Sequence, residues 1–160
     1  MALAFDFEKQ MVVGNDGEGF FTRCYPDIAP VKSTVDLAFD FNSSLGGIEL
    51  KTDTYDMTAT PNFFFERYSD MKSCKLGGPW RSFNDGVPYF VYLFSNNQIF
   101  FWFKPAELVA FLDEYTKTLK YKTIRNKAWT TSGYCVPRDA VKHLYEQHSF
   151  TIDGKPKEGF

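Results

Sequence analysis

The sequence predicts a single α/β or α+β domain in which helices flank a central mixed β-sheet. At 160 residues the chain is long enough for one domain with a substantial core and short for two. We expect this core at about 14–148, followed by a polar tail at 151–160. Three patterns support the fold class: alternating segments at 35–41 and 47–53, aromatic β-prone segments at 89–94 and 99–103, and an amphipathic segment at 105–120 that begins with proline.

The N-terminal region is compatible with two structures. Residues 2–13 suit either a helix or a strand. The GNDG sequence at 14–17 predicts a break, because glycine disfavours a helix interior and Asn and Asp are good N-caps. We therefore expect a short helix over 18–25, ended by the two prolines that follow.

A β-hairpin is predicted between residues 35 and 53. Apolar and polar residues alternate over 35–41, NSSLGG at 42–47 favours a turn, and GIELKTD at 47–53 alternates again. In such a hairpin the acids of both strands lie on the same side of the sheet.

The remaining elements follow from their residue types. The aromatic segments at 89–94 and 99–103 form a second hairpin across SNNQ. We also predict a third strand at 62–68, a long polar loop at 73–86, a helix at 105–120, a partly extended segment at 122–134 and a final helix at 137–148.

Composition argues against several classes of protein. The net charge of −2 provides no overall attraction for nucleic acid, so an anionic partner would need a local patch or a metal ion. The three cysteines are widely spaced without a C-x-x-C pair, which favours reduced thiols in a cytosol-like compartment, and His143 and His148 are interpreted as surface residues. We expect no membrane span and no signal peptide.

The charged face of the predicted hairpin has the composition of a phosphodiester-hydrolysing site. Mg²⁺ held by one or two carboxylates can neutralise the transition state and activate water, and a lysine can orient that water. Asp36 and Glu49 are the candidate ligands, assisted by the Leu50 carbonyl, and Lys51 is the candidate for contact with the water. Asp40 remains an alternative to Asp36 because it has the same facing.

These residues resemble a known family. Asp36-Leu37 followed by IELKTD at 48–53 resembles the PD-(D/E)XK nuclease superfamily, and the chain looks similar to its small phage-type endonucleases and Holliday-junction-resolvase-like members. TPNFFFE at 60–66, the glycine-bearing segment at 77–94 and GYCVPRDAV at 133–141 extend the resemblance over roughly residues 14–141.

The resemblance implies a restriction-endonuclease-like fold and a DNA endonuclease that depends on Mg²⁺ or Mn²⁺. In that family Asp36, Glu49 and Lys51 would be catalytic, and Glu18 would be an additional metal ligand. A homodimer acting in the cytoplasm, the host cytoplasm if the protein is viral, is also implied.

Further contacts to DNA are left open by the sequence. Asn62 and Glu66 share one strand face and could extend the site, and Trp80 with Arg81 could contact a base and a phosphate from a loop. Trp80 could equally fold back onto the core. The cations at 120, 122, 125 and 127 fit either a backbone contact or a solvated face. Two other functions remain: a non-catalytic single-stranded nucleic-acid-binding module and an inactive nuclease-like interaction protein.

Overall fold

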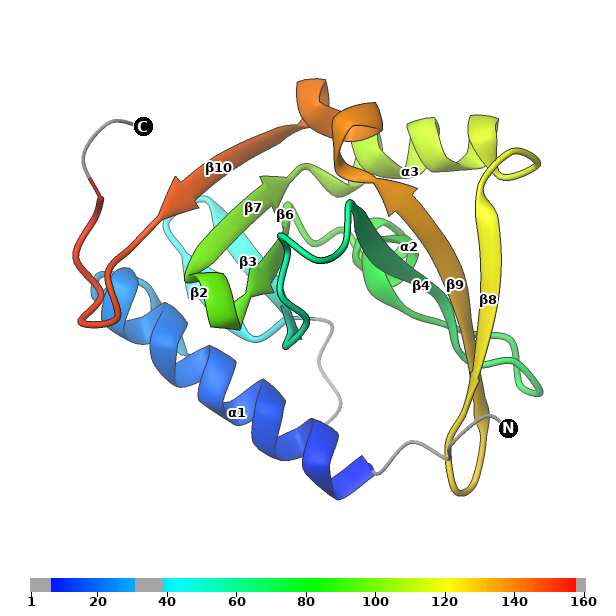
Figure 1. The fold of residues 1–160 in the computed structure, drawn as a ribbon, viewed down its shortest axis with the longest axis horizontal. Helices are drawn as coiled ribbons and strands as arrows, with labels where there is room; N and C mark the ends of the chain where they lie inside the picture. Colours follow the sequence, from blue (N-terminus) through cyan, green and yellow to red (C-terminus); the bar gives the residue numbers. More distant parts are fainter. Residues whose placement is uncertain (1–6, 31–38, 158–160) are drawn as a thin grey trace.

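The computed structural model describes residues 7–30 and 39–157, and of residues 7–15 only the backbone (Figure 1). It contains a mixed six-stranded sheet in the order β1-β2-β3-β6-β7-β10 and an antiparallel four-stranded sheet in the order β5-β4-β9-β8. The predicted mixed α/β class is confirmed. The elements are α1 (Phe7–Cys24), β1 (Ala29–Pro30), β2 (Phe41–Ser43), β3 (Gly46–Asp53), β4 (Asn62–Asp70), β5 (Lys75–Leu76), α2 (Gly78–Asn84), β6 (Tyr89–Phe94), β7 (Ile99–Phe103), α3 (Pro105–Tyr115), β8 (Lys120–Arg125), β9 (Thr130–Pro137), the 3₁₀ helix η2 (Arg138–Leu144) and β10 (Tyr145–Ser149).

The six-stranded sheet is mixed because β3 and β6 run parallel, from the pair Ile48–Tyr89 to the pair Asp53–Phe94. The chain between them forms β4, β5 and α2, which is long enough for the crossover that a parallel pair requires. The neighbouring pairs β2–β3, β6–β7 and β7–β10 are antiparallel.

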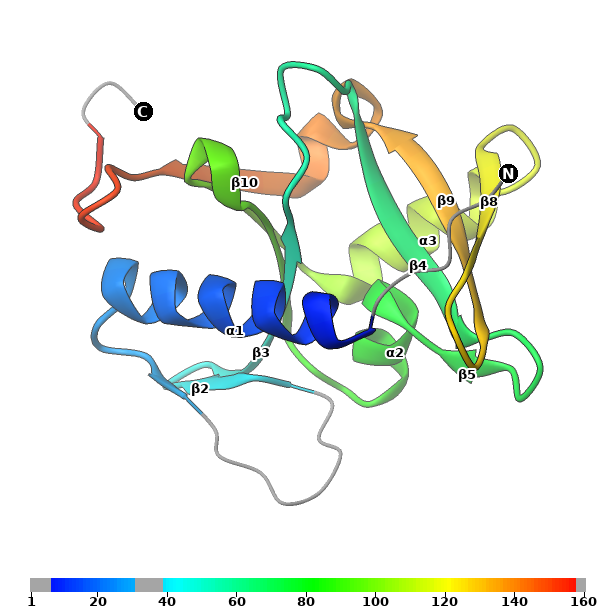
Figure 2. The ribbon, with the colours of Figure 1, turned by 60° about the horizontal axis from the view of Figure 1, so that its bottom comes forward.

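Each face of the six-stranded sheet buries a separate apolar cluster. On one face Phe21 of α1 packs with Ile48, Leu50 and Phe100. On the other face Phe63 and Phe65 of β4 pack with the opposite side chains of β6 and β7, together with residues of α2 and α3. Figures 1 and 2 show α1 along one side of this sheet, with the four-stranded sheet set apart from it. Glu49 and Lys51 of β3 pair with Phe90 and Tyr92 of β6, so these charged residues lie on the face of the sheet that packs against β4.

The predicted break at 14–17 is wrong, because α1 continues through it. A Cβ atom on Gly17 would lie 1.9 Å from the Thr52 hydroxyl, so glycine here allows α1 to approach β3 closely. Packing against the sheet outweighs the low helix propensity of glycine. The ambiguity at 2–13 is resolved as helix from Phe7 onward.

Several other boundaries differ from the prediction. The helix predicted at 137–148 is wrong in its second half, because residues after Leu144 form β10 and complete the sheet beside β7. The helix predicted at 105–120 ends at Tyr115, and the predicted loop at 73–86 contains β5 and α2. The strand predicted at 62–68 belongs to the second sheet as β4. The aromatic strands β6 and β7 match their predicted bounds.

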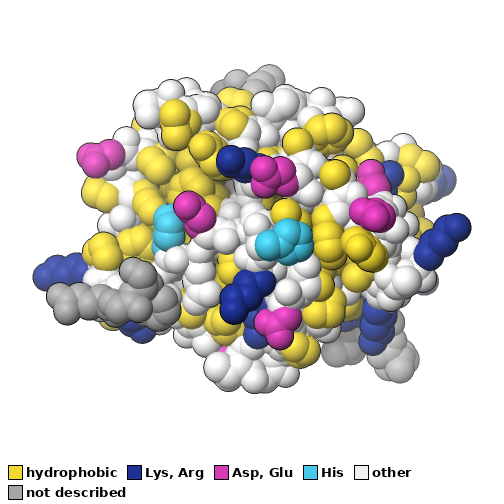
Figure 3. Space-filling model, turned by 90° about the horizontal axis from the view of Figure 1, so that it is seen from above, with side chains coloured by type: hydrophobic (Ala, Val, Ile, Leu, Met, Phe, Trp, Pro, Cys, Tyr) yellow, Lys and Arg dark blue, Asp and Glu magenta, His cyan; other side chains and the backbone are white. Residues whose placement is uncertain are grey.

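The outer surface mixes apolar and charged side chains. Figure 3 shows the histidine side chains apart from each other on one face of the molecule. His143 is exposed, whereas His148 is half-buried and lies 2.8 Å from the Tyr25 hydroxyl through Nδ1. None of the described helices is both long and apolar enough to cross a membrane.

Candidate functional site

The β2–β3 hairpin brings Asp40 to Glu49. Phe41 pairs with Ile48, so in the same register Asp40 lies opposite Glu49. The Asp40 N–H donates to the Ile48 carbonyl at 2.8 Å, and the Leu50 N–H donates to Asp40 Oδ2 at 2.9 Å. The Asp40 carboxylate is therefore held against the backbone of β3, next to the Glu49 side chain.

Glu49 and Lys51 project from the same face of β3, two residues apart. In the parallel pairing with β6 they lie beside Phe90 and Tyr92, whose side chains belong to the apolar cluster against β4. Ile48 belongs to the opposite cluster against α1. A carboxylate and an ammonium group thus share a face of the sheet that is apolar at the neighbouring positions of β6, where electrostatic interactions are stronger than in water.

Three carboxyl groups interact beside Glu49 of β3, and we call Glu18, Asp40 and Glu49 the carboxylate cluster. Burial, the charge of Asp40 and a hydrogen bond with Asp40 raise the pKa of Glu18 from 4.5 to about 7. The same three causes hold the pKa of Glu49 well above its usual range, and the charge of Glu18 adds to them. The cluster has more negative charge than its surroundings can stabilise, and a proton or a cation can relieve it.

Cationic side chains border the cluster on one side. Arg81 of α2 lowers the pKa of Glu49, and its Nε lies 3.7 Å from Asp85 Oδ2. Burial raises the pKa of Glu66 on β4, whereas the charges of Lys51 and Arg81 act to lower it. Arg81 thus acts electrostatically on carboxylates from both sheets, and Lys51 of the six-stranded sheet acts on Glu66 of the other.

Glu66 is positioned by glycines on neighbouring segments. A Cβ atom on Gly77 would lie 2.2 Å from Glu66 Oε1, and one on Gly78 would lie 2.6 Å from the Glu66 carbonyl oxygen. Gly78 also has a φ of +49°, which glycine adopts without strain. The Gly-Gly sequence that precedes α2 therefore makes room for the Glu66 carboxyl group.

The predicted metal and catalytic residues have different outcomes. Asp36 lies outside the described residues, whereas its alternative Asp40 lies in the carboxylate cluster with Glu18 and Glu49. The Leu50 side chain is buried against α1 as expected, and its N–H is the donor to Asp40.

Of the two alternatives left open for Trp80, contact with a base and folding back onto the core, the structure shows the second. Its side chain is 3% exposed within α2, its indole N–H donates to Asp113 Oδ1 at 2.9 Å, and Arg67 covers its ring. Asn62 begins β4, whereas Glu66 lies at its middle, about 13 Å further along the strand at the usual rise per residue. The structure thus associates Glu66 and Arg81 with the cluster, but not Trp80 or Asn62.

Tyr92 is a polar residue that sequence reasoning missed. Its hydroxyl donates to Asp53 Oδ2 at 2.5 Å and accepts the Phe64 N–H at 3.2 Å, so it joins β3, β6 and β4. Burial and the charge of Asp53 hold its pKa well above the usual range. The available signal was a hydroxyl in an otherwise apolar strand, since a buried tyrosine usually has a hydrogen-bond partner.

The donor set suits a hard divalent cation. Carboxylate oxygens are the ligands that Mg²⁺ prefers, and Mg²⁺ is commonly held by one or two carboxylates together with water. Among the described residues no group of three or more His, Cys, Asp or Glu is arranged so that it could hold a metal ion. The fit is therefore to a site of two protein carboxylates, Asp40 and Glu49, and not to a closed protein cage.

No protein-family model matches this chain, and no curated protein matches it.

Proposed function

We propose that this protein is a DNA nuclease of the PD-(D/E)XK type that requires Mg²⁺ or Mn²⁺ and has a restriction-endonuclease-like core. One observation supports it above the others. Asp40 raises the pKa of both Glu18 and Glu49, and Lys51 follows Glu49 by two residues on the same face of β3. A solvated strand face would leave these carboxyl groups near their ordinary pKa.

In this proposal Asp40 and Glu49 bind the cation, and Glu18 adds negative charge beside them without being a ligand. The cation would supply positive charge beside the phosphodiester and make water a better nucleophile. Lys51 Nζ orients the attacking water by hydrogen bonding, and the apolar side chains around β3 exclude other water. The positive charge of Arg81 attracts the anionic substrate toward the cluster. The negative charge of Glu66 attracts Lys51 and Arg81 and so favours their position near the cluster.

The test is a cleavage assay in Mg²⁺ and in Mn²⁺ with linear duplex, nicked, single-stranded and four-way-junction DNA. Glu49→Gln weakens the hold on the cation and Lys51→Ala removes the donor to the water. Each is expected to lose roughly 100-fold or more of the activity, the usual effect of removing one group that stabilises the transition state electrostatically. Glu107→Gln and Lys142→Ala make the same chemical changes at exposed positions and should stay within about twofold of the wild type. Circular dichroism checks that each variant is folded.

Absence of cutting by the wild type on all four substrates in both metals would reject the nuclease proposal. Retained, metal-independent binding of single strands would then favour the non-catalytic binding module. Cutting by Lys51→Ala at the wild-type rate would reject the role given to Lys51. A homodimer stays a prediction, to be checked by sedimentation.

A further inference from the structure

The chain is locally basic at β8 and the turn that follows it. Between Glu114 and Asp139 the sequence contains no acidic residue, although the whole chain has a net charge of −2. Four cations lie close together in this interval, and we call residues 120–127 the basic strand: Lys120, Lys122, Arg125 and Lys127. Lysines on an edge strand also protect it from pairing with another chain, so the charge alone does not decide the role.

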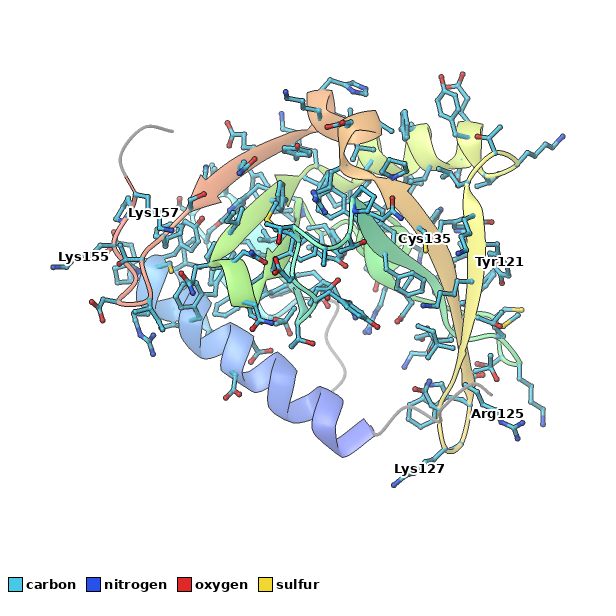
Figure 4. All side chains as sticks on the ribbon, in the orientation of Figure 1. Tyr121, Arg125, Lys127, Cys135, Lys155 and Lys157 are labelled. Carbon is cyan, nitrogen blue, oxygen red and sulfur yellow. The ribbon has the colours of Figure 1, made fainter. Side chains whose placement is uncertain are left out.

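The basic strand is accessible along its length. β8 ends the order of the four-stranded sheet, and all of its residues except Ile124 are exposed. Tyr121 is 46% exposed. Figure 4 shows Tyr121 on β8, with Arg125 and Lys127 toward the tip of the β8–β9 hairpin and projecting outward. Its partner β9 is buried or half-buried over most of its length, so the edge of β8 is the surface that a partner can reach.

Hydrogen bonds hold the tip of this hairpin in place. The Asn126 N–H donates to the Trp129 carbonyl at 2.7 Å, and Asn126 Nδ2 donates to Thr131 Oγ1 at 3.0 Å. Thr131 Oγ1 in turn donates to the Ser69 carbonyl of β4 at 3.0 Å. The cations are therefore carried by an ordered backbone, so binding would order mainly side chains.

A hollow of about 540 Å³ lies beside the tip. Its lining includes Lys72, Arg125 and Lys127, together with Asp70 as the acidic member. The positive charge of the basic strand thus continues onto the chain that follows β4.

One row of the four-stranded sheet connects the basic strand to the candidate site. Glu66 of β4 pairs with Gly133 of β9, and Gly133 pairs with Lys122 of β8. Paired residues project from the same face, so Lys122 lies two strand spacings from Glu66, about 10 Å. Gly133 adds no side chain between them, and a Cβ there would meet the Phe65 carbonyl at 2.4 Å.

We propose that the basic strand docks the phosphate backbone of a duplex DNA arm beside the carboxylate cluster. This inference rests on the proposed nuclease function and specifies its substrate as duplex. Lys120 and Lys122 project from one face of β8 and Arg125 from the other, which matches the two phosphate rows on either side of a groove. Contacts to phosphates carry no base information, so docking is independent of sequence.

The test is fluorescence anisotropy with the full chain and a 30-base-pair duplex of arbitrary sequence in EDTA, between 50 and 200 mM KCl. Each phosphate contact contributes a slope of about −0.9 to log K against log[salt], so a lost pair of contacts reduces the slope by ~1.8. Lys120→Gln/Lys122→Gln and Arg125→Gln/Lys127→Gln are each expected to weaken binding roughly tenfold or more at ~0.1 M salt. Lys155→Gln/Lys157→Gln removes the same charge at the far end of the molecule and should bind as the wild type does (Figure 4).

Three outcomes would overturn the inference: unchanged binding by both basic-strand variants, an equal loss in the Lys155 and Lys157 control, or tighter binding to single strands than to duplex. Sedimentation is run on the same samples, because self-association of the variants with unchanged DNA binding would show edge protection instead. Duplex binding without cutting by the wild type in either metal would reject the nuclease and leave the docking surface standing, so the two failures are distinguishable.

Discussion

Asp40→Asn is the substitution that most directly examines the carboxylate cluster. It removes one charge with little change of volume, and the amide oxygen of the new side chain can still accept the Leu50 N–H that Asp40 accepts at 2.9 Å. The charge of Asp40 and its hydrogen bond are the second and third causes of the raised pKa of Glu18, after burial. We therefore expect the substitution to lower the pKa of Glu18 from about 7 toward 4.5 without restoring it fully.

The expected size follows from the linkage between protonation and folding. A Glu18 pKa that rises from 4.5 to about 7 on folding stabilises the protein fully below pH 4.5, and this stabilisation is lost as the pH rises through 7. Each pKa unit corresponds to about 1.4 kcal/mol, so with solvent screening we expect Glu18 to contribute about 2 kcal/mol to the free energy of unfolding. Asp40→Asn should remove about half of that contribution.

The assay is urea unfolding at pH 5 and pH 8, with Asp27→Asn as an exposed control of equal charge change. In the wild type the stability supplied by Glu18 and Glu49 decreases from pH 5 to pH 8. In Asp40→Asn this decrease should be smaller by about 1 kcal/mol or more, and in Asp27→Asn it should stay the same. An equal decrease in all three proteins would show that Asp40 is not coupled to the other carboxyl groups, and the site argument would fail.

Three further predictions concern the fold and the metal. In urea titrations Gly133→Ala should lower the free energy of unfolding by about 2–4 kcal/mol, because the new Cβ would collide with the Phe65 carbonyl. Gly19→Ala should raise the free energy of unfolding by about 0.5–1 kcal/mol, because Gly19 is at an exposed position of α1 and a Cβ there would have nothing within 4 Å. Trp80→Phe should cost about 1–2 kcal/mol, because it removes the indole N–H bond to Asp113 and leaves part of the buried volume of Trp80 unfilled. It should leave duplex affinity in anisotropy unchanged, and a selective loss of DNA binding would contradict the burial of this side chain. Isothermal titration with Mn²⁺ should show tighter binding and less proton release at pH 8 than at pH 6. Below its pKa of about 7 Glu18 retains a proton that the cation must displace. Equal affinity for Mn²⁺ at both pH values would contradict this prediction.

Local patterns predicted the elements whose stability is decided nearby in the chain. The strands β6 and β7 match their aromatic segments, α3 begins at the predicted Pro105, and Glu49 and Lys51 share one face of β3. Alternation with a period of two and a proline at the first helical position are direct consequences of backbone geometry.

Long-range packing decided what these patterns left open or misjudged. α1 continues through Gly17 because Thr52 of β3 occupies the space of its side chain, and residues after Leu144 become β10 because β7 offers them an edge. Trp80 is buried because Asp113 of α3 accepts its N–H. Each of these contacts joins residues that are more than 30 positions apart in the sequence, so local patterns could not predict them.

The sequence by itself determined that an acid and a lysine would lie side by side on a strand, since alternate residues of any strand share a face. Only the tertiary structure decided which carboxyl groups join them. The β2–β3 register brings Asp40 opposite Glu49, and α1 carries Glu18 close enough to interact with both. The electrostatic coupling of these groups depends on distances across separate elements and on their burial, and neither is encoded in residue spacing along the chain.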